Sequence, residues 1–527
     1  MLAPAGPCME LARTLVFEAK KSGVVMGSDR FDVLREQVRG QVIEEDDAEY
    51  DAARLVFNGM INRHPAAVLR VSQVADVMAA VRFARGLDIE VALRGGGHSA
   101  PGFGTVDGGL VLDFSARRGV RVDPAARLAR VEPGATWADY NHATHAFGLA
   151  STGGIVGSTG VAGLTLGGGI GYLSRKYGLA CDNLVSADVV LADGTFVTAS
   201  EAENVDLFWA LRGGSGNFGV VTSMEFRLHP VDMVHIGIIF FDATLGAQVG
   251  AAYREWIAAE PEEMGAFLGF HRGPPVPFLP EEWHGKPVAV IAGMWTGDLD
   301  AGPAHWQAML DAGPVLGSFF APMPYPALNI MFDGLSGIPG LQGYWKADFL
   351  RTLSDDALRT AVHYAPGIPG VHSANHFYPI DGAVQRVAPE ATAFAYRDVN
   401  FSPVIAGQWP EPSENEKNIA WVRDYWGALH EFSEPGGYLN FQDADDQSRI
   451  EDTLGSNYAR LAELKAKYDP DNFFHVNQNI KPAVAGAAQA AVPVQQPAVL
   501  QAEAVPEEAR QREAAPPDAN PAEGAAT

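Results

Sequence analysis

A histidine that sits among glycines is the feature of this sequence best suited to chemistry. His98 belongs to the run RGGGHS at residues 94–99. Glycine carries no side chain that blocks close approach, so the imidazole can reach a ring bound at this loop. An imidazole nitrogen is also a competent nucleophile near neutral pH. The position therefore suits attack on a bound ring, and the simpler alternative is that His98 only caps the loop.

Two further glycine-rich runs follow, at residues 153–171 (GGIVGSTGVAGLTLGGGIG) and 213–219 (GGSGNFG). Successive backbone N–H groups in such loops form concavities that suit a pyrophosphate. One such loop is most often a structural turn, but three within residues 94–219 favour a dinucleotide site.

The glycine runs do not fit the common nucleotide fingerprints. Gly214, Gly216 and Gly219 match GxGxxG, but that motif must follow a strand and open a helix, and an alternating strand, VVTSMEFRLHP, comes next. Motifs for a P-loop, zinc hydrolysis, thiol redox or serine acyl transfer are missing from the sequence. His142 and His145 lack a third ligand, which favours a solvated helix face, so no metal site is predicted.

The elements around the first glycine loop predict a βαβ unit. AAVLRV predicts a strand, and apolar residues at i, i+3, i+4 and i+7 then predict a helix that Ser72 caps and Gly86 ends. The next strand, IEVALR, leads directly into residues 94–99, which places the glycine loop at a strand's carboxyl end. Glycine density falls after Pro230, where longer strands and helices take over, and this change marks a domain boundary.

Composition limits the classes of protein to consider. The chain has 527 residues, 47% of them hydrophobic, and a formal charge of −26. Such a length predicts two domains, and so acidic a chain argues against a nucleic-acid partner. No long apolar run predicts a membrane span, and the absence of a signal-peptide pattern predicts a cytoplasmic protein. Cys8 and Cys181 are too few for a disulfide framework and are expected to stay reduced.

The two ends of the chain are expected to lie outside the globular body. Residues 1–30 are predicted to be an N-terminal extension. Residues 483–527 are rich in Ala, Pro, Gln and Glu and lack aromatic residues, so they cannot bury enough apolar surface to offset chain entropy. This segment is predicted to be a disordered tail.

Five segments together resemble a known family. They are RGGGHS, GSTGVAGLTLGGGIGYLSRKYGLACDNLVSADVVLADG, GGSGNFGVVTSMEFRLHP, YLNFQDADD and YARLAELKAKYDPDNFFHVNQNI. In this order they resemble the FAD-linked oxidases of the vanillyl-alcohol oxidase superfamily, and most closely the berberine bridge enzyme-like group. The resemblance covers roughly residues 31–482.

The resemblance implies an α+β fold in two parts. A PCMH-type FAD-binding domain would comprise residues 31–232 together with a returning segment, residues 438–482. Residues 233–437 would form a substrate-binding domain, an antiparallel sheet with helices that roofs the flavin.

The resemblance also implies the cofactor and its contacts. FAD would be held by a single covalent 8α-histidyl link through His98, because Val156 stands where some relatives have a second, cysteinyl link. Thr159 falls where the family has a residue thought to gate oxygen access. Asn477 and Asn479 are candidates for late contacts near the flavin, and purely structural roles are the alternative for both. The expected FAD contacts are Arg94, Gly95, Gly96, Gly97, His98, Ser99, Gly157, Ser158, Thr159, Gly160, Gly163, Gly168, Gly171, Val221 and Asn477.

The implied reaction is transfer of a hydride from a small alcohol, phenol, secondary metabolite or carbohydrate to FAD, with molecular oxygen then reduced to hydrogen peroxide. Many relatives use the last tyrosine of a Y-x-N-Y pattern as the base, but here that position is Phe441, which cannot accept a proton. Strand alternation puts His376 and Tyr378 on one face, and they are candidates for the missing base. Tyr396 and Tyr438 are further candidates.

Two alternatives stay open. The protein could be a flavin dehydrogenase that uses an acceptor other than oxygen. It could also be a flavin-loaded binding protein without turnover, which the missing tyrosine motivates.

Overall fold

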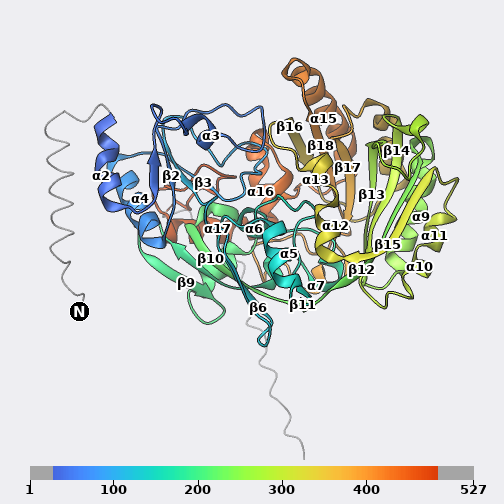
Figure 1. The fold of residues 1–527 in the computed structure, drawn as a ribbon, viewed down its shortest axis with the longest axis horizontal. Coiled ribbons are helices and arrows are strands. Elements are labelled where there is room, and N and C mark those ends of the chain that lie inside the picture. The colour runs from blue at the N-terminus through green and yellow to red at the C-terminus, as the bar shows by residue number, and fades with distance from the viewer. Residues whose placement is uncertain (1–27, 485–527) are drawn as a thin grey trace, which may run out of the picture. The chain divides into compact units, whose positions relative to one another are not determined.

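The computed structural model describes residues 28–484, and the predictions for residues 1–27 and 485–527 lie outside the described residues. Besides a two-stranded sheet of β7 (Leu149–Ala150) and β11 (His229–Pro230), the N-terminal half contains two larger sheets (Figure 1). The first has the order β1-β2-β4-β3, in which β2, β4 and β3 are parallel and β1 is antiparallel. Its strands are β1 (Gln41–Ile43), β2 (Ala67–Arg70), β4 (Leu110–Asp113) and β3 (Val91–Arg94).

The predicted βαβ start is present, with small changes at the helix ends. Helix α4 (Val74–Leu87) joins β2 to β3. Gln73, not Ser72, is the N-cap, and the buried Asp76 carboxylate accepts hydrogen bonds from the backbone N–H groups of residues 72 and 73. The helix continues past Gly86 and ends where Asp88 adopts a left-handed conformation (φ 58°). Asp76, the third residue of the helix, thus reaches back to the backbone before the helix, as in a capping box.

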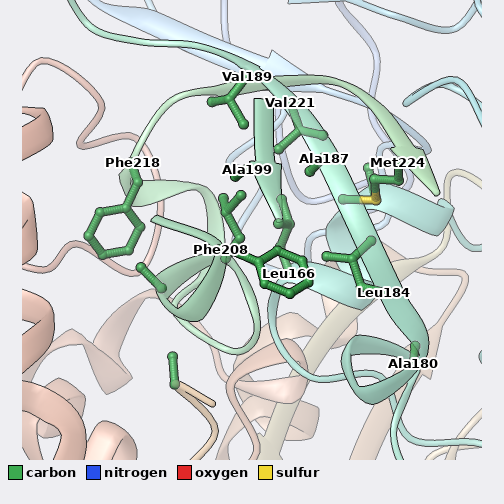
Figure 2. Close-up of a cluster of buried hydrophobic side chains, with 14 of the residues drawn as sticks. Leu166, Ala180, Leu184, Ala187, Val189, Ala199, Phe208, Phe218, Val221 and Met224 are labelled. Atoms are coloured by element: carbon green, nitrogen blue, oxygen red, sulfur yellow. The ribbon is translucent and has the colours of Figure 1, made fainter. Parts of the chain in front are cut away.

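The second sheet is antiparallel, with the order β5-β6-β10-β8-β9. Figure 2 shows its buried face, where Leu166 and Phe208 from neighbouring helices meet Val221 and other strand residues. The same core contains Leu461 and Ile480, so the C-terminal segment packs on this sheet. The elements are β5 (Val120–Asp123), β6 (Leu128–Val131), β10 (Val220–Arg227), β8 (Leu184–Val190), β9 (Phe196–Ser200), α6 (Val161–Leu166), α8 (Val205–Leu211) and α17 (Tyr458–Tyr468).

The third sheet has seven antiparallel strands, in the order β15-β12-β14-β13-β17-β18-β16. One face packs on helices α9, α14 and α15, and the other forms a second core with residues of the N-terminal half (Figure 1). The elements are β15 (Gly317–Pro324), β12 (Met233–Asp242), β14 (Pro287–Trp295), β13 (Met264–Arg272), β17 (Ala374–Pro379), β18 (Phe401–Trp409), β16 (Gln342–Ala347), α9 (Gly246–Ala259), α14 (Asp355–Tyr364) and α15 (Asn415–His430).

Helices and antiparallel sheets together confirm the predicted α+β class, while the predicted domain boundaries stay a prediction. Short elements connect the sheets. Among residues 28–484, no helix has both the length and the apolar character needed to cross a bilayer. The short elements that connect the sheets include α5 (Trp137–His145), α7 (Ser174–Tyr177), α12 (Tyr325–Met331), α13 (Asp333–Ser336), α16 (Ile450–Leu454) and the 3-10 turn η9 (Leu439–Phe441).

Candidate active site

One cavity of about 300 Å³ connects the glycine loops to the seven-stranded sheet. Residues of all three glycine runs line one part of it, and side chains of β16, β17 and β18 line another. Its volume falls at the lower end of the range typical of small-molecule and cofactor sites. The tertiary structure therefore brings the predicted dinucleotide loops and three of the four predicted base candidates, His376, Tyr378 and Tyr438, to one site.

Two of the glycine runs touch each other at the cavity wall. A Cβ on Gly96 would lie 2.5 Å from the backbone nitrogen of Gly160, and a Cβ on Gly160 would lie 2.6 Å from that of Gly96. Backbone presses against backbone here and cannot move aside as a flexible side chain would. Glycine at both positions is thus required for the wall to form.

Gly163 needs a different explanation. It is an exposed residue inside helix α6 on the cavity wall, and a Cβ there would meet nothing within 4 Å. Alanine is the better helix former at such a position. Gly216, also on the wall, has the same free space around it. Glycines without a neighbour inside the protein are expected where a ligand approaches the backbone, so the cavity fits FAD.

Asn477 adds a polar group to this cradle. It lines the cavity, and its buried side-chain oxygen has no hydrogen-bond partner among the described residues. A buried polar atom without a partner costs about 1–3 kcal/mol, and a ligand can relieve that cost. Asn479 also has an unpartnered buried oxygen but does not line the cavity.

His98 lies on the cavity wall with its ring stacked on Phe57, at 4.1 Å between ring centroids and 20° between planes. Burial lowers the pKa of His98 to about 4. The imidazole is therefore neutral near pH 7 and keeps a free nitrogen lone pair.

Arg94 lines the cavity but is already paired. Its guanidinium lies 3.0 Å from the Asp113 carboxylate, both side chains are buried, and it donates a hydrogen bond to the Leu55 carbonyl. Arg94 thus holds β3 against β4 and fixes the loop that follows β3. Because its guanidinium is already paired, the backbone N–H groups of the loop are the donors that remain for a phosphate.

Most of the predicted contact residues reach the cavity. Gly95, Gly97, Ser99, Thr159 and Val221 line it together with the residues described above, and so do His376, Tyr378 and Tyr438. Val156, where relatives place a second link, is also on the wall.

Five predicted residues do not line the cavity: Gly157, Ser158, Gly168, Gly171 and Tyr396. The Gly157 N–H donates to the Asp333 carboxylate at the start of α13, at 2.7 Å, so a protein carboxylate takes the place expected for a phosphate. Ser158, the next residue, is half-buried, and a Cβ on Gly337, the residue after α13, would lie 3.0 Å from its hydroxyl oxygen.

The other three serve packing. Gly168 (φ 118°) makes room for the Phe394 ring, and Gly171 lies against the Gly153 carbonyl. Tyr396 stacks on Phe349 and donates its hydroxyl to the Asp452 carbonyl. Glycine runs predict close approach but do not say whether a ligand or another part of the chain is the neighbour.

Tyr438 immediately precedes the 3-10 turn η9, and Phe441 is the last residue of that turn. The turn points Phe441 at the cavity, with its ring parallel to that of Tyr378 (6.4 Å, 7°). The Tyr438 hydroxyl accepts three N–H groups: those of Gly169 (3.0 Å), Ile170 (3.1 Å) and the Asn440 amide (2.8 Å). Burial raises the pKa of Tyr438 to about 12 despite these donors. Tyr438 therefore anchors the end of the second glycine run, at Gly169 and Ile170, rather than presenting a free base.

Tyr378 and His376 lie next to each other on β17, on the face toward the cavity. The Tyr378 hydroxyl lies 2.5 Å from His376 Nδ1, and His376 Nε2 lies 2.7 Å from Nε2 of His271 on β13. Burial raises the pKa of Tyr378 and lowers that of His376. His271 was not among the residues predicted for the site. The alternation Phe267, Gly269, His271 was a signal, but only the pairing of β13 with β17 gives it meaning.

The wall opposite the glycine loops is mostly apolar and aromatic. Trp345 of β16 and Phe441 lie 5.8 Å apart between ring centroids, and Val404 and Ala406 of β18 extend the surface. Among the described residues, no Asp, Glu or Lys lines the cavity. Residues 28–484 also contain no group of three His, Cys, Asp or Glu placed to hold a metal ion.

Comparison with known proteins agrees with this site. The family model described as an FAD binding domain matches residues 65–200, and the one described as berberine and berberine like matches residues 437–481. The FAD-linked oxidoreductase hasG of Aspergillus fumigatus is 30% identical over 457 residues, which cover 81% of this chain and 94% of hasG.

Two solved structures are similar throughout. Crystalline 6-hydroxy-D-nicotine oxidase from Arthrobacter nicotinovorans matches with a TM-score of 0.75 and 25% identity, over 85% of this chain and 98% of that one. Xylooligosaccharide oxidase from Myceliophthora thermophila, solved with xylobiose, matches with a TM-score of 0.73 and 26% identity, over 87% of this chain and 100% of that one. With its two family segments, its cavity and this full-length similarity, the chain belongs to the berberine bridge enzyme-like FAD-linked oxidoreductases.

Proposed function

We propose that this protein oxidises a small, uncharged alcohol or phenol with an apolar or aromatic body, using FAD joined covalently to His98 and molecular oxygen as the final acceptor. One observation carries the proposal: a single cavity has His98 and the glycine loops on one side and the Tyr378–His376 pair on the other. When bound, FAD supplies a two-electron oxidant that accepts a hydride from a C–H bond.

His98 is suited to hold the flavin ring. Its pKa of about 4 keeps the imidazole neutral, so a ring nitrogen is free to bond to the 8α carbon. Stacking on Phe57 fixes the orientation of the imidazole before that bond forms. Val156 offers no thiol, so the link through His98 is the single covalent link proposed.

Tyr378 and His376 supply the base that Phe441 cannot. Both line the cavity, and a hydroxyl that donates to an imidazole leaves its own oxygen free to accept the substrate's O–H. Because the pKa of Tyr378 is raised, a permanently ionised phenol is not expected. The proton instead passes from Tyr378 to His376 while the substrate's proton arrives.

The cavity wall indicates the substrate class. A sugar exposes a hydroxyl on nearly every carbon and needs a matching set of polar partners, whereas Trp345, Phe441, Val404 and Ala406 offer apolar surface. His372 and Gln408 are among the few other polar side chains near β17 and β18. An aromatic or apolar body therefore fits better than an oligosaccharide, the substrate class named for the similar xylooligosaccharide oxidase.

Anaerobic mixing tests the proposal. Aromatic alcohols and phenols should bleach the visible flavin absorbance, and xylobiose or cellobiose should not. Tyr378→Phe should slow bleaching by about 10²- to 10⁴-fold, the usual contribution of a general base. Tyr364→Phe, a tyrosine on α14 behind the sheet, is the matched control and should behave as the wild type. Rapid bleaching by the disaccharides alone would overturn the substrate class.

Aeration of the reduced protein separates the remaining alternatives. Fast return of colour with formation of hydrogen peroxide supports an oxidase. Slow return in air, but fast return with an artificial electron acceptor, would show a dehydrogenase. Failure of every substrate class to bleach the flavin would leave a binding protein without turnover, the function that Phe441 alone would suggest.

A further inference from the structure

Three side chains form a continuous hydrogen-bonded chain that begins at the cavity and ends behind it. Tyr378 and His376 line the cavity, and His271 does not. The Tyr378 hydroxyl lies 2.5 Å from His376 Nδ1, and His376 Nε2 lies 2.7 Å from His271 Nε2. His271 is half-buried, and it is the next-to-last residue of β13.

Gly269 makes this contact possible. It pairs with His376 across the β13–β17 ladder, and it shares a face with His271 two residues further along. A Cβ at position 269 would lie 2.9 Å from the His376 ring and 3.0 Å from His271 Nε2. Any side chain at 269 would therefore force the two imidazoles apart. The glycine has an ordinary strand backbone, so the space it leaves is its contribution.

The two imidazoles must share one proton between facing nitrogens. Two N–H groups cannot point at each other, so one Nε2 donates and the other accepts. If Tyr378 donates to His376 Nδ1, the proton of neutral His376 lies on Nε2 and is donated to His271. The chain then points outward throughout. If His271 donates, every bond in the chain points inward.

We propose that His271 is a positioning residue that sets the proton on His376 and carries the substrate's proton from Tyr378 to the outside of the cavity. This proposal rests on the proposed function. The substrate O–H gives its proton to the Tyr378 oxygen, the Tyr378 proton moves to His376 Nδ1, and the His376 Nε2 proton moves to His271 Nε2. His271 Nδ1 releases one proton to water, so one proton enters the chain and one leaves.

The same movement run backward restores the chain. Tyr378 then gives a proton into the cavity, and His271 takes one from water. Reduction of oxygen to hydrogen peroxide by the reduced flavin requires two electrons and two protons, of which the reduced flavin carries one proton. The chain supplies the second proton. Outward and inward arrangements thus alternate between the two halves of the reaction without any ring turning over.

The surroundings keep the chain uncharged. Phe267 covers the His376 ring at 4.5 Å, and Phe441 covers Tyr378. The titratable groups that face the chain are Tyr438 and Tyr172, both buried phenols with raised pKa values. Burial also lowers the pKa of His271 to about 4. A neutral chain can pass a proton in either direction, whereas a fixed imidazolium would hold it.

Variants of His271 and Gly269 test the proposal in the flavin-loaded protein. His271→Ala should slow anaerobic flavin bleaching by about 10²-fold with little change in the substrate concentration for half-maximal rate. Added imidazole should restore much of the rate, and bleaching should become dependent on buffer acid. Gly269→Ala should also slow bleaching, because its methyl group would push the two imidazoles apart. His284→Gln, a half-buried histidine of the same sheet domain whose ring bonds only to the Leu279 carbonyl, is the control.

A second measurement does not depend on turnover. Protein labelled with ¹⁵N-histidine should show His271 and His376 neutral at pH 6, with a shared proton between their Nε2 atoms. Tyr378→Phe should shift the His376 tautomer, and His271→Ala should shift it too. These spectra decide the case if a variant fails to fold.

The outcomes separate the two proposals. Wild-type bleaching that His271→Ala leaves unchanged, or a loss that imidazole cannot restore, would overturn the proton chain and leave the function standing. A wild type that no substrate bleaches would overturn the function, and the histidine spectra would then judge the chain alone. Independent protonation of His271 and His376 near pH 6 would also overturn the proton chain.

Discussion

Gly163 offers the sharpest test of the cofactor cradle, because the protein's own structure gives no reason for a glycine there. Alanine at this exposed helical position should stabilise the cofactor-free protein by about 1 kcal/mol, the difference in helix propensity. In a folded body of this size that corresponds to a rise in Tm of about 1 °C. If FAD packs against this backbone, the added methyl group should cost about 1–3 kcal/mol of binding energy. That is a roughly 5- to 150-fold loss of FAD affinity.

Thermal unfolding of one variant with and without FAD measures both its stability and its affinity for FAD. The His98→Ala background prevents covalent trapping, so a ligand that binds only the folded state raises Tm according to its free concentration and Kd. Gly163→Ala should raise Tm without FAD and shrink the rise that FAD produces.

Gly427→Ala is the matched control. Gly427 is also an exposed glycine inside a helix, α15, with nothing within 4 Å of a Cβ, but it does not line the cavity. It should raise Tm equally with and without FAD. The same result for Gly163→Ala would refute the placement of FAD against α6. Gly96→Ala differs from both, because its Cβ meets the backbone of Gly160 and should lower Tm in every condition.

Three other predictions concern single residues. His98→Ala should lose the yellow band that stays with the wild-type protein on a denaturing gel, and a wild type whose colour washes out would contradict the covalent link. Lys465→Met should lower the free energy of unfolding by about 3–5 kcal/mol in urea titrations. The reason is that the fully buried Asp469 carboxylate, 2.7 Å from Lys465 Nζ, would lose its counter-charge. A change below about 1 kcal/mol would show that water or a rearrangement replaces the lost ion pair. Burial lowers the pKa of His229 from its ordinary 6.5 to about 4, so its contribution to stability is present above pH 6.5 and is lost as the pH falls toward 4. His229→Gln, which can keep the contact to Asn183, should make the free energy of unfolding depend less on pH between pH 6.5 and 4. An unchanged slope of this free energy against pH would contradict the role of His229.

The sequence alone was enough to predict most of the glycine-loop residues that line the cavity. Residues 94–99 and 213–219 are local signals, because a glycine's freedom of approach depends only on its own missing side chain. The pairing of His376 with Tyr378 on one face was also predictable, since strand alternation depends on two neighbouring residues. The helix ends predicted at Ser72 and Gly86 were wrong, because the Asp76 carboxylate takes the backbone N–H groups at the start of α4 and the helix turns left-handed only at Asp88.

What the sequence could not decide was which group each of these residues meets. Gly163 faces open space at the cavity, whereas Gly168 and Gly171 face protein, although all three belong to one glycine run. His271 lies 105 positions from its partner in the chain and becomes part of the site only through the β13–β17 register. Local residues determine conformation and face, but antiparallel register and loop contacts are set by packing between distant segments. The sequence by itself therefore determined what kind of molecule this protein binds, and the tertiary structure decided which side chains line the cavity, because those side chains come from segments far apart in the chain.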